Sequence, residues 1–196
     1  MKLRASLLVA ALTMLLMAGV AGAQQPPAVP ADGSPLAETG TVANPVSTTV
    51  KAQLARFTKN MVAAAEAMPA EKYNFKPTPE MNSFGHLVMH IAQSNHLLCA
   101  KISGQTAPDV KLADTDTKEK LVAGLKDSFT YCAAMLEKTN DANLGDSMML
   151  FGKNPTSRAA AWIALSDGWN DHYGAQAIYL RLNGILPPTA QPAKKE

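Results

Sequence analysis

Apolar residues recur at intervals of three and four along four separate stretches of the chain. In the first stretch the recurring positions are Val50, Leu54, Phe57, Met61 and Ala64. Such spacing is typical of an amphipathic helix that buries one face against a core. Asn44 and Pro45 precede the pattern as an N-cap residue and a first-turn proline, and Pro69 follows it. The first helix is therefore predicted to begin near Asn44-Pro45 and to end before Pro69.

The second and third stretches have the same character. The second runs from about Asn82 to Ile102, and its apolar side consists of Phe84, Leu87, Val88, Ile91, Leu98, Cys99 and Ile102. The third opens with Asp116 and Glu119 in the spacing of a capping box, which predicts a helix start there. The third helix is expected to end near Thr139, and its apolar side consists of Leu121, Leu125, Phe129, Cys132 and Leu136.

A fourth helix is predicted from about Thr156 to Asn183, after a loop that spans residues 141–155. Gly184 and the pair Pro187-Pro188 end it. Its inner face carries Trp162, Leu165, Trp169, Tyr173, Gln176 and Leu180. Four amphipathic helices without a strand pattern predict an all-α protein with the architecture of a four-helix bundle.

The segments on either side of these helices lack a periodic pattern. Residues 24–44 are rich in Pro and Ala and predict a flexible linker. Residues 189–196, beyond the last helix, are expected to form a disordered tail. The bundle is assigned to residues 45–188, which is enough chain for a single core.

The first 23 residues have the pattern of an export signal. Lys2 and Arg4 precede an apolar, uncharged run from Leu7 to Ala18, and Ala21-Gly22-Ala23 provides small residues for cleavage. The run is shorter than the roughly 18–20 residues of a membrane-spanning helix, so a cleaved signal peptide (residues 1–23) is favoured over an uncleaved anchor. We therefore expect an exported protein, periplasmic or secreted, with no stable membrane anchor after cleavage.

The balance of charge excludes one class of partner. The chain has 18 Lys and Arg residues against 16 Asp and Glu residues, and the basic residues Lys2 and Arg4 belong to the predicted signal. A mature chain without excess positive charge or a basic run has no electrostatic footprint for nucleic acid. An unknown small molecule is compatible with the sequence as a partner, and both a monomer and a homodimer remain open.

Two cysteines bear on how the helices are connected. Cys99 lies near the end of the second helix and Cys132 in the last third of the third. If these helices ran antiparallel, the two residues would lie roughly 20 Å apart along the bundle at 1.5 Å per residue. If they ran parallel, the residues would come within reach of a disulfide, and the segment 103–115 is long enough to lead the chain back. In an oxidising compartment a Cys99–Cys132 bridge is favoured, with two free buried thiols as the alternative.

Three segments resemble the DinB/YfiT-like family of helical bundles. They are the proline-rich connector of residues 68–80, the segment Ser83–Ala92 that contains Phe84-Gly85 and His90, and the segment from His172-Tyr173-Gly174 to Pro188. The resemblance spans roughly residues 45–188, nearly all of the predicted domain. It implies an up-down-down-up bundle with a long crossover between the second and third helices.

The same resemblance implies a metal site. The family's site has one histidine on the second helix and a His-x-x-x-His pair on the fourth, which together hold a divalent metal. His90 matches the first ligand and His172 the later member of the pair, whereas Gly168 occupies the place of the earlier member. His86, four residues before His90, is a candidate substitute ligand. A zinc, nickel or manganese ion is therefore expected to be weakly bound or absent, because catalytic zinc normally has three protein ligands.

Two functions fit these residues. The first is an exported DinB-like bundle of unknown specific activity, with a partly degenerate histidine metal site, that acts as a binding or accessory domain. The alternative is a divalent-metal-dependent transferase or hydrolase that acts on a small molecule, with the metal acidifying a bound water or thiol. The catalytic residues stay unknown, because the sequence shows neither a nucleophilic triad pattern nor a phosphate-binding glycine loop.

Overall fold

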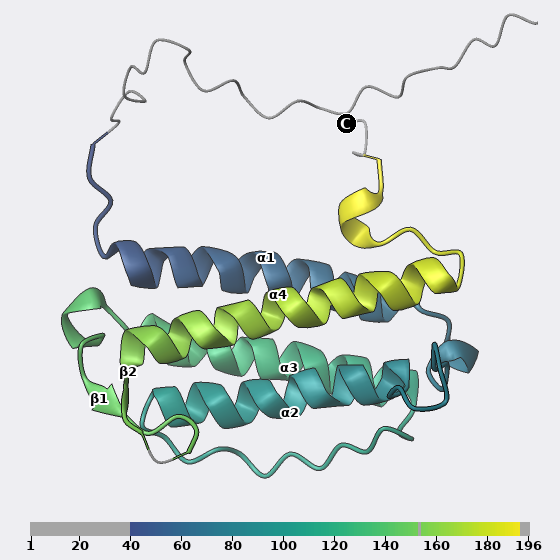
Figure 1. The fold of residues 1–196 in the computed structure, drawn as a ribbon, viewed down its shortest axis with the longest axis horizontal. Helices are drawn as coiled ribbons and strands as arrows, with labels where there is room; N and C mark the ends of the chain where they lie inside the picture. Colours follow the sequence, from purple (N-terminus) through teal and green to yellow (C-terminus); the bar gives the residue numbers. More distant parts are fainter. Residues whose placement is uncertain (1–39, 153, 193–196) are drawn as a thin grey trace, which may run out of the picture. The chain divides into compact units, whose positions relative to one another are not determined.

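Four long helices dominate the computed structural model, which describes residues 40–152 and 154–192. They are α1 (Pro45–Ala67), α2 (Phe84–Ile102), α3 (Lys118–Glu137) and α4 (Arg158–Leu182). The helices pack around one apolar core (Figure 1). The predicted all-α class and the four helices are therefore confirmed. The predicted signal, residues 1–23, and most of the predicted linker, residues 24–44, lie outside the described residues.

Helices α2 and α3 run parallel. Asn95 contacts Ser128, and Cys99 is joined to Cys132, with a sequence separation of 33 in each pair. Parallel neighbours need a connection that returns along the bundle. Residues 103–117 provide this connection as a crossover that runs alongside the helices (Figure 1).

Helices α1 and α4 run in the opposite direction to α2 and α3. His90 of α2 meets His172 of α4, and further along α2 Asn95 meets Trp169, so residue numbers fall on one helix as they rise on the other. Ion pairs between α1 and α3 follow the same opposed order. The α2–α4 and α1–α3 pairs are therefore antiparallel. Within the described residues, no helix is both long enough and apolar enough to cross a membrane.

The predicted disulfide between Cys99 and Cys132 is present and joins the two parallel helices inside the core. Both residues are fully buried, and their Cα atoms lie 5.3 Å apart. This separation falls in the usual range for a disulfide. The bridge uses both cysteines of the chain.

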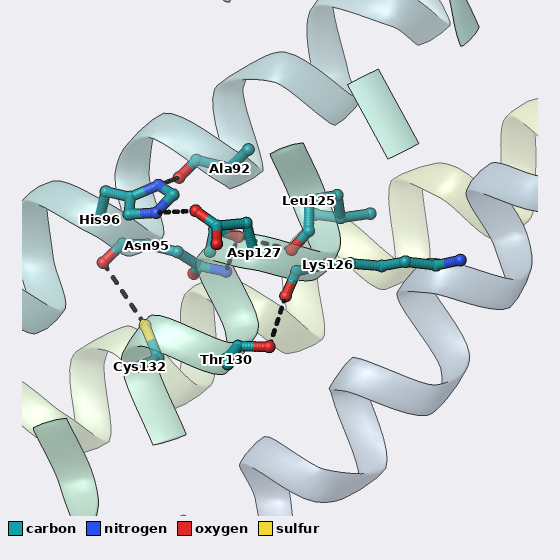
Figure 2. Close-up of polar contacts among 9 residues, drawn as sticks. Ala92, Asn95, His96, Leu125, Lys126, Asp127, Thr130 and Cys132 are labelled. Carbon is teal, nitrogen blue, oxygen red and sulfur yellow. Dashed lines mark hydrogen bonds and ion pairs between the residues drawn. The ribbon is translucent and has the colours of Figure 1, made fainter. Parts of the chain in front are cut away.

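A polar seam accompanies the disulfide between α2 and α3 (Figure 2). His96 is buried, with Nδ1 2.9 Å from a carbonyl oxygen of its own helix and Nε2 3.1 Å from the Asp127 carboxylate. The neighbouring Asn95 amide donates to Ser128 Oγ at 3.1 Å, and its side-chain oxygen accepts from Trp169 Nε1 at 2.7 Å. Buried polar groups are stable when partners satisfy them, so this seam aligns α2 with both α3 and α4.

Helix α1 begins at Pro45 as predicted, but the Asn44 side chain does not cap it. Asp141, the first residue of the short 3₁₀ helix η2 (Asp141–Asn143), accepts from the N–H groups of Val46 at 3.0 Å and Ser47 at 2.9 Å. Burial raises the pKa of the Asp141 carboxyl, but the hydrogen bonds from Ser47 and Val46 outweigh it and hold the pKa below its ordinary value. A carboxylate at a helix N-terminus also interacts favourably with the helix dipole.

The predicted capping box of α3 is wrong by one residue. Thr117, not Asp116, accepts from the backbone N–H of Lys120. The Asp116 carboxylate instead accepts from a backbone N–H of the crossover and from the Lys120 side chain. It therefore stabilises the turn just before the helix and does not cap the helix. Helix α4 begins at Arg158 with Ser157 as its N-cap, slightly later than predicted.

A short antiparallel strand pair contradicts the expectation of a chain without strands. Strands β1 (Ser147–Met148) and β2 (Thr156–Ser157) have only two residues each, too few for an alternating pattern to appear in the sequence. The connection between them carries Leu150 to the end of α2, where Lys101 Nζ donates to the Leu150 carbonyl oxygen at 2.6 Å.

Gly85 in α2 allows two other segments to approach the helix closely. Its N–H donates to the carbonyl oxygen of Tyr73, just after the 3₁₀ helix η1 (Ala70–Lys72), at 2.8 Å. A Cβ atom at this position would lie 2.8 Å from the Asp114 carbonyl oxygen and 3.3 Å from that of Tyr73. The Phe84-Gly85 motif therefore brings the connector and the crossover together on α2.

The C-terminal segment packs on the bundle for longer than predicted. Gly184, with a φ of 74°, ends α4, and the chain then forms the 3₁₀ helix η3 (Pro188–Ala190). The N–H of Thr189 donates to the Tyr173 hydroxyl oxygen at 3.1 Å. Residue 189 was assigned to a disordered tail, 189–196, but it is held by α4; residues 193–196 lie outside the described residues.

Candidate functional site

His90 and His172 face each other across the antiparallel α2–α4 seam. Their ring centroids are 5.1 Å apart, and the ring planes meet at 19°. His172 is half-buried and His90 is exposed, because each lies at the edge of its helix's core-facing side. The two matching positions of the family motif are therefore neighbours in space, as the resemblance implied.

His86 extends this pair into a row of three imidazoles. Its ring stacks on that of His90 at a centroid distance of 6.4 Å, with 7° between the planes. Its Nδ1 lies 3.5 Å from the carboxylate of Asp114 in the crossover, and a third of its side chain is exposed. Nearly parallel rings at these separations do not direct three nitrogens to one point about 2 Å from each, the geometry that a metal needs.

The third ligand of the family motif has no counterpart. Gly168 lies one helical turn before His172, and a Cβ atom there would meet nothing within 4 Å. Asp171 has a carboxylate oxygen 3.4 Å from His172 Nδ1, but its side chain is 86% exposed. Across residues 40–152 and 154–192, no group of three or more His, Cys, Asp or Glu side chains is arranged to hold a metal ion. The residues present do not fit a three-ligand metal centre.

The surroundings of His90 favour its neutral form. Burial lowers the pKa of His90 below its ordinary value, and the neighbouring His172 and His86 lower it further. Its Nε2 lies 3.5 Å from Ser94 Oγ. The imidazole is thus available near neutral pH to donate or accept one hydrogen bond at each nitrogen.

A cavity of about 310 Å³, which we name the α2–α4 cavity, opens beside the histidine pair. It includes the space left by Gly168. Its polar lining residues are His90, Ser94, Asn95 and His172, and its other lining residues are mostly aliphatic or aromatic, with Ile91, Leu98, Ile102, Leu150, Phe151, Leu165 and Trp169 among them. The amide of Asn95 already bonds Ser128 and Trp169, so the imidazoles and the Ser94 hydroxyl are the polar groups left for a ligand.

A second cavity, of about 410 Å³, lies on the other side of His90. Its lining includes His86, Glu80 and Tyr179, and it is more open and more polar than the first. The pKa of Tyr179 is raised by burial, and its hydroxyl donates to the Asn82 carbonyl oxygen at 2.7 Å, so this tyrosine is a structural donor. His90 is thus the residue that lines both cavities.

Sequence reasoning found the histidine pair and Gly168 but missed the cover of the cavity. Leu150 and Phe151 lie in the connection between β1 and β2, where no periodic pattern assigns a residue to one face. Phe151 is 67% exposed. In the sequence, the only indication that this loop lines a cavity is a large aromatic residue among polar ones.

The protein is a helical domain of the four-helix-bundle class in which a histidine on α2 faces a histidine on α4. Comparison with known proteins identifies its family. A family model described as the DinB superfamily matches residues 53–166, more than half of the chain. The protein belongs to the DinB superfamily.

Solved structures show the same fold. A DinB-like protein from Bacillus cereus superposes with a TM-score of 0.62 at 16% identity, over 72% of this chain and 95% of that one. A DinB-like protein from Bacillus subtilis gives a TM-score of 0.60 at 22% identity, over 74% and 99%. A conserved protein from Enterococcus faecalis gives 0.55 at 19% identity, over 69% and 95%. No curated protein matches the sequence.

Proposed function

We propose that this chain is an exported DinB-superfamily domain that binds a small molecule in the α2–α4 cavity and keeps only part of a histidine metal site. The observation that carries the proposal is the position of Gly168, which lines the cavity one helical turn from His172. The absent side chain has two consequences at once. It removes the third metal ligand, and it leaves open a space that a bound molecule can occupy.

The size and lining of the cavity support binding. Small-molecule sites are concave, mainly apolar and furnished with a few polar groups, and their volumes begin at about 300 Å³. The α2–α4 cavity, at about 310 Å³, has this character. Its walls come from two helices of the bundle, which hold their side chains more rigidly than loops do.

Two features support export. Lys2, Arg4, the apolar run Leu7–Ala18 and the small residues Ala21-Gly22-Ala23 form the pattern of a cleavable signal. The Cys99–Cys132 disulfide adds a second argument, because disulfides persist mainly in oxidising compartments. We therefore place the mature protein in the periplasm or outside the cell.

A neutral apolar dye, N-phenyl-1-naphthylamine, tests binding directly, because its fluorescence rises in an apolar cavity. We expect saturable binding that Gly168→Leu weakens at least tenfold, since the new side chain fills the cavity. Gly174→Leu is the matched control: Gly174 also lies in α4, also has open space at Cβ, and does not line the cavity. Equal affinity in both variants would overturn the proposal, and so would the absence of saturable binding by both this dye and an unbranched aliphatic probe.

Metal analysis tests the alternative, a metal-dependent transferase or hydrolase. Protein purified without a chelating tag should contain clearly less than one zinc, nickel or manganese ion per chain, because two imidazoles alone hold a metal weakly. A stoichiometric metal that is lost in both His90→Ala and His172→Ala would establish the metal-dependent function instead.

A further inference from the structure

We propose that the natural ligand of the α2–α4 cavity is an aliphatic monocarboxylic acid, with its carboxylate at the His90–His172 pair and its chain directed toward Ile102. This inference rests on the proposed function, since it names the ligand of the same cavity. It comes from the shape of the cavity, from the order of its polar and apolar lining, and from the charges that the lining lacks.

The lining of the cavity extends along both helices. Along α2 its lining begins at His90 and ends at Ile102, twelve residues later, which corresponds to roughly 18 Å at 1.5 Å per residue. Along the antiparallel α4 it begins at His172 and ends at Ala161. A volume of about 310 Å³ spread over that length suits a single unbranched chain better than a branched one.

Polarity changes along this length in one direction. The imidazoles and the Ser94 hydroxyl lie at one end, and the far end is formed by Ile102, Leu150 and Phe151. Leu97 and Phe151 are 54% and 67% exposed, although both line the cavity. A bound hydrocarbon chain would cover them, and burial of apolar surface contributes about 25 cal/mol per Å².

The lining selects the head group. None of the described residues that line the cavity is Lys, Arg, Asp or Glu. The Asp171 carboxylate, 3.4 Å from His172 Nδ1, lies outside the lining and is exposed to solvent, which screens its charge. The two nearby cations are engaged at the far end, where Lys101 bonds the Leu150 carbonyl oxygen and Arg158 bonds that of Ile102. A doubly charged phosphate head would lack compensating charge, and an ammonium head would find no carboxylate among the lining residues. A carboxylate can accept from imidazole N–H and from the Ser94 hydroxyl.

Direct calorimetric titration with four probes of defined chemistry tests this assignment: decanoate, decanol, decylamine and butyrate. Decanoate should bind at least tenfold more tightly than butyrate, which lacks the chain, and at least tenfold more tightly than decylamine, which has the wrong head. Decanol should bind with intermediate affinity. His172→Leu should weaken decanoate at least fivefold relative to decanol, because it removes a donor to the carboxylate and leaves the apolar contacts in place.

The outcomes separate this inference from the proposed function. If N-phenyl-1-naphthylamine binds and Gly168→Leu blocks it, but decanoate binds no better than decylamine or butyrate, the monocarboxylate assignment is wrong and the binding function stands. If His172→Leu weakens decanoate and decanol equally, the carboxylate does not lie at the histidine pair, and the assignment is likewise wrong. If neither the dye nor decanoate binds, the proposed function itself fails.

Discussion

The two sides of α2 differ in how completely their polar groups are satisfied. On the α3 side, Cys99 is bridged, and both nitrogens of the buried His96 face acceptors. On the α4 side, His172 Nδ1 is buried and forms no hydrogen bond among the described residues, although an Asp171 carboxylate oxygen lies 3.4 Å away, and a cavity opens beside the histidine pair. One face of the helix is thus closed by a covalent bridge and hydrogen bonds, and the other is open and only partly bonded.

The difference indicates how a small bundle can keep a binding cavity. Empty space in a core costs stability, because the lining atoms lose their packing partners. A covalent bridge and the polar seam hold α2 against α3 on the opposite face and compensate for the looser packing on the cavity side. The closed face therefore provides rigidity for the open one.

The largest expected effect comes from removing the bridge on the closed face. The double variant Cys99→Ala with Cys132→Ala should lose about 3–4 kcal/mol of unfolding free energy, the entropy of closing a loop of this length. Urea unfolding with and without a reductant measures it. The wild type should lose a similar amount on reduction, whereas the double variant should not respond to reductant. A reductant-insensitive wild type would mean that the bridge does not stabilise the fold.

The next effect concerns Asn95, which belongs to both faces. Asn95→Leu leaves Trp169 Nε1 without its acceptor, whereas Ser128 Oγ keeps its own bond to the Leu125 carbonyl oxygen. The variant should cost about 1–3 kcal/mol, the cost of one buried unpaired group. Ser94→Ala, one residue earlier, is the matched control and should stay within about 0.5 kcal/mol. Equal unfolding midpoints for the two variants would contradict the bonded seam.

The third prediction concerns the open face and restores the missing metal ligand. Gly168→His places another imidazole one turn from His172, and both it and the control Gly174→His should gain a few tenths of a kcal/mol from helix propensity. Only Gly168→His should gain more with zinc, about 2.7 kcal/mol when zinc is at one hundred times its dissociation constant. Thermal unfolding with and without zinc provides the measurement. If zinc stabilised the two variants equally, a side chain at position 168 would not be directed toward the histidine pair.

The smallest expected effect is a pH dependence of the open face. Burial, together with His172 and His86, lowers the pKa of His90 below its ordinary 6.5. As the pH falls, the unfolded chain binds a proton at this residue before the folded chain does, so folded stability should decrease from the ordinary pKa down to the lowered one. Urea midpoints of metal-free protein between about pH 7.5 and about pH 5.5 should fall less in His90→Gln than in the wild type. If the urea midpoints of the two proteins changed equally with pH, His90 would not be the source of the pH dependence.

Local patterns were sufficient to predict the helices and the cysteine pair. The apolar stripes have the helical period, and the depth of Cys99 and Cys132 along their helices carries the information about parallel packing. The strand pair β1–β2 was missed because two residues cannot display a period. The cap of α1 was missed because its donor groups and Asp141 are brought together only by tertiary structure.

Only the part of the candidate site that depends on the family motif and on residue spacing could be predicted. His90, His172 and Gly168 follow from the resemblance, and their proximity follows from antiparallel packing of α2 and α4. The cavity depends on where a loop places Leu150 and Phe151, and no periodic rule governs that. The distances that decide against a three-ligand centre are likewise properties of the packed bundle.

The cap on α1 has a consequence for the order in which the molecule is assembled during synthesis. Asp141 follows Val46 by 95 residues, so the ribosome completes α1 long before the carboxylate that bonds its first turn exists. At ordinary elongation rates the delay is about 5–20 s. Throughout that interval the leading N–H groups of α1 have only water as a partner. Helix α1 is therefore synthesised before the other three helices, but the hydrogen bonds at its N-terminus are among the last in the bundle to form.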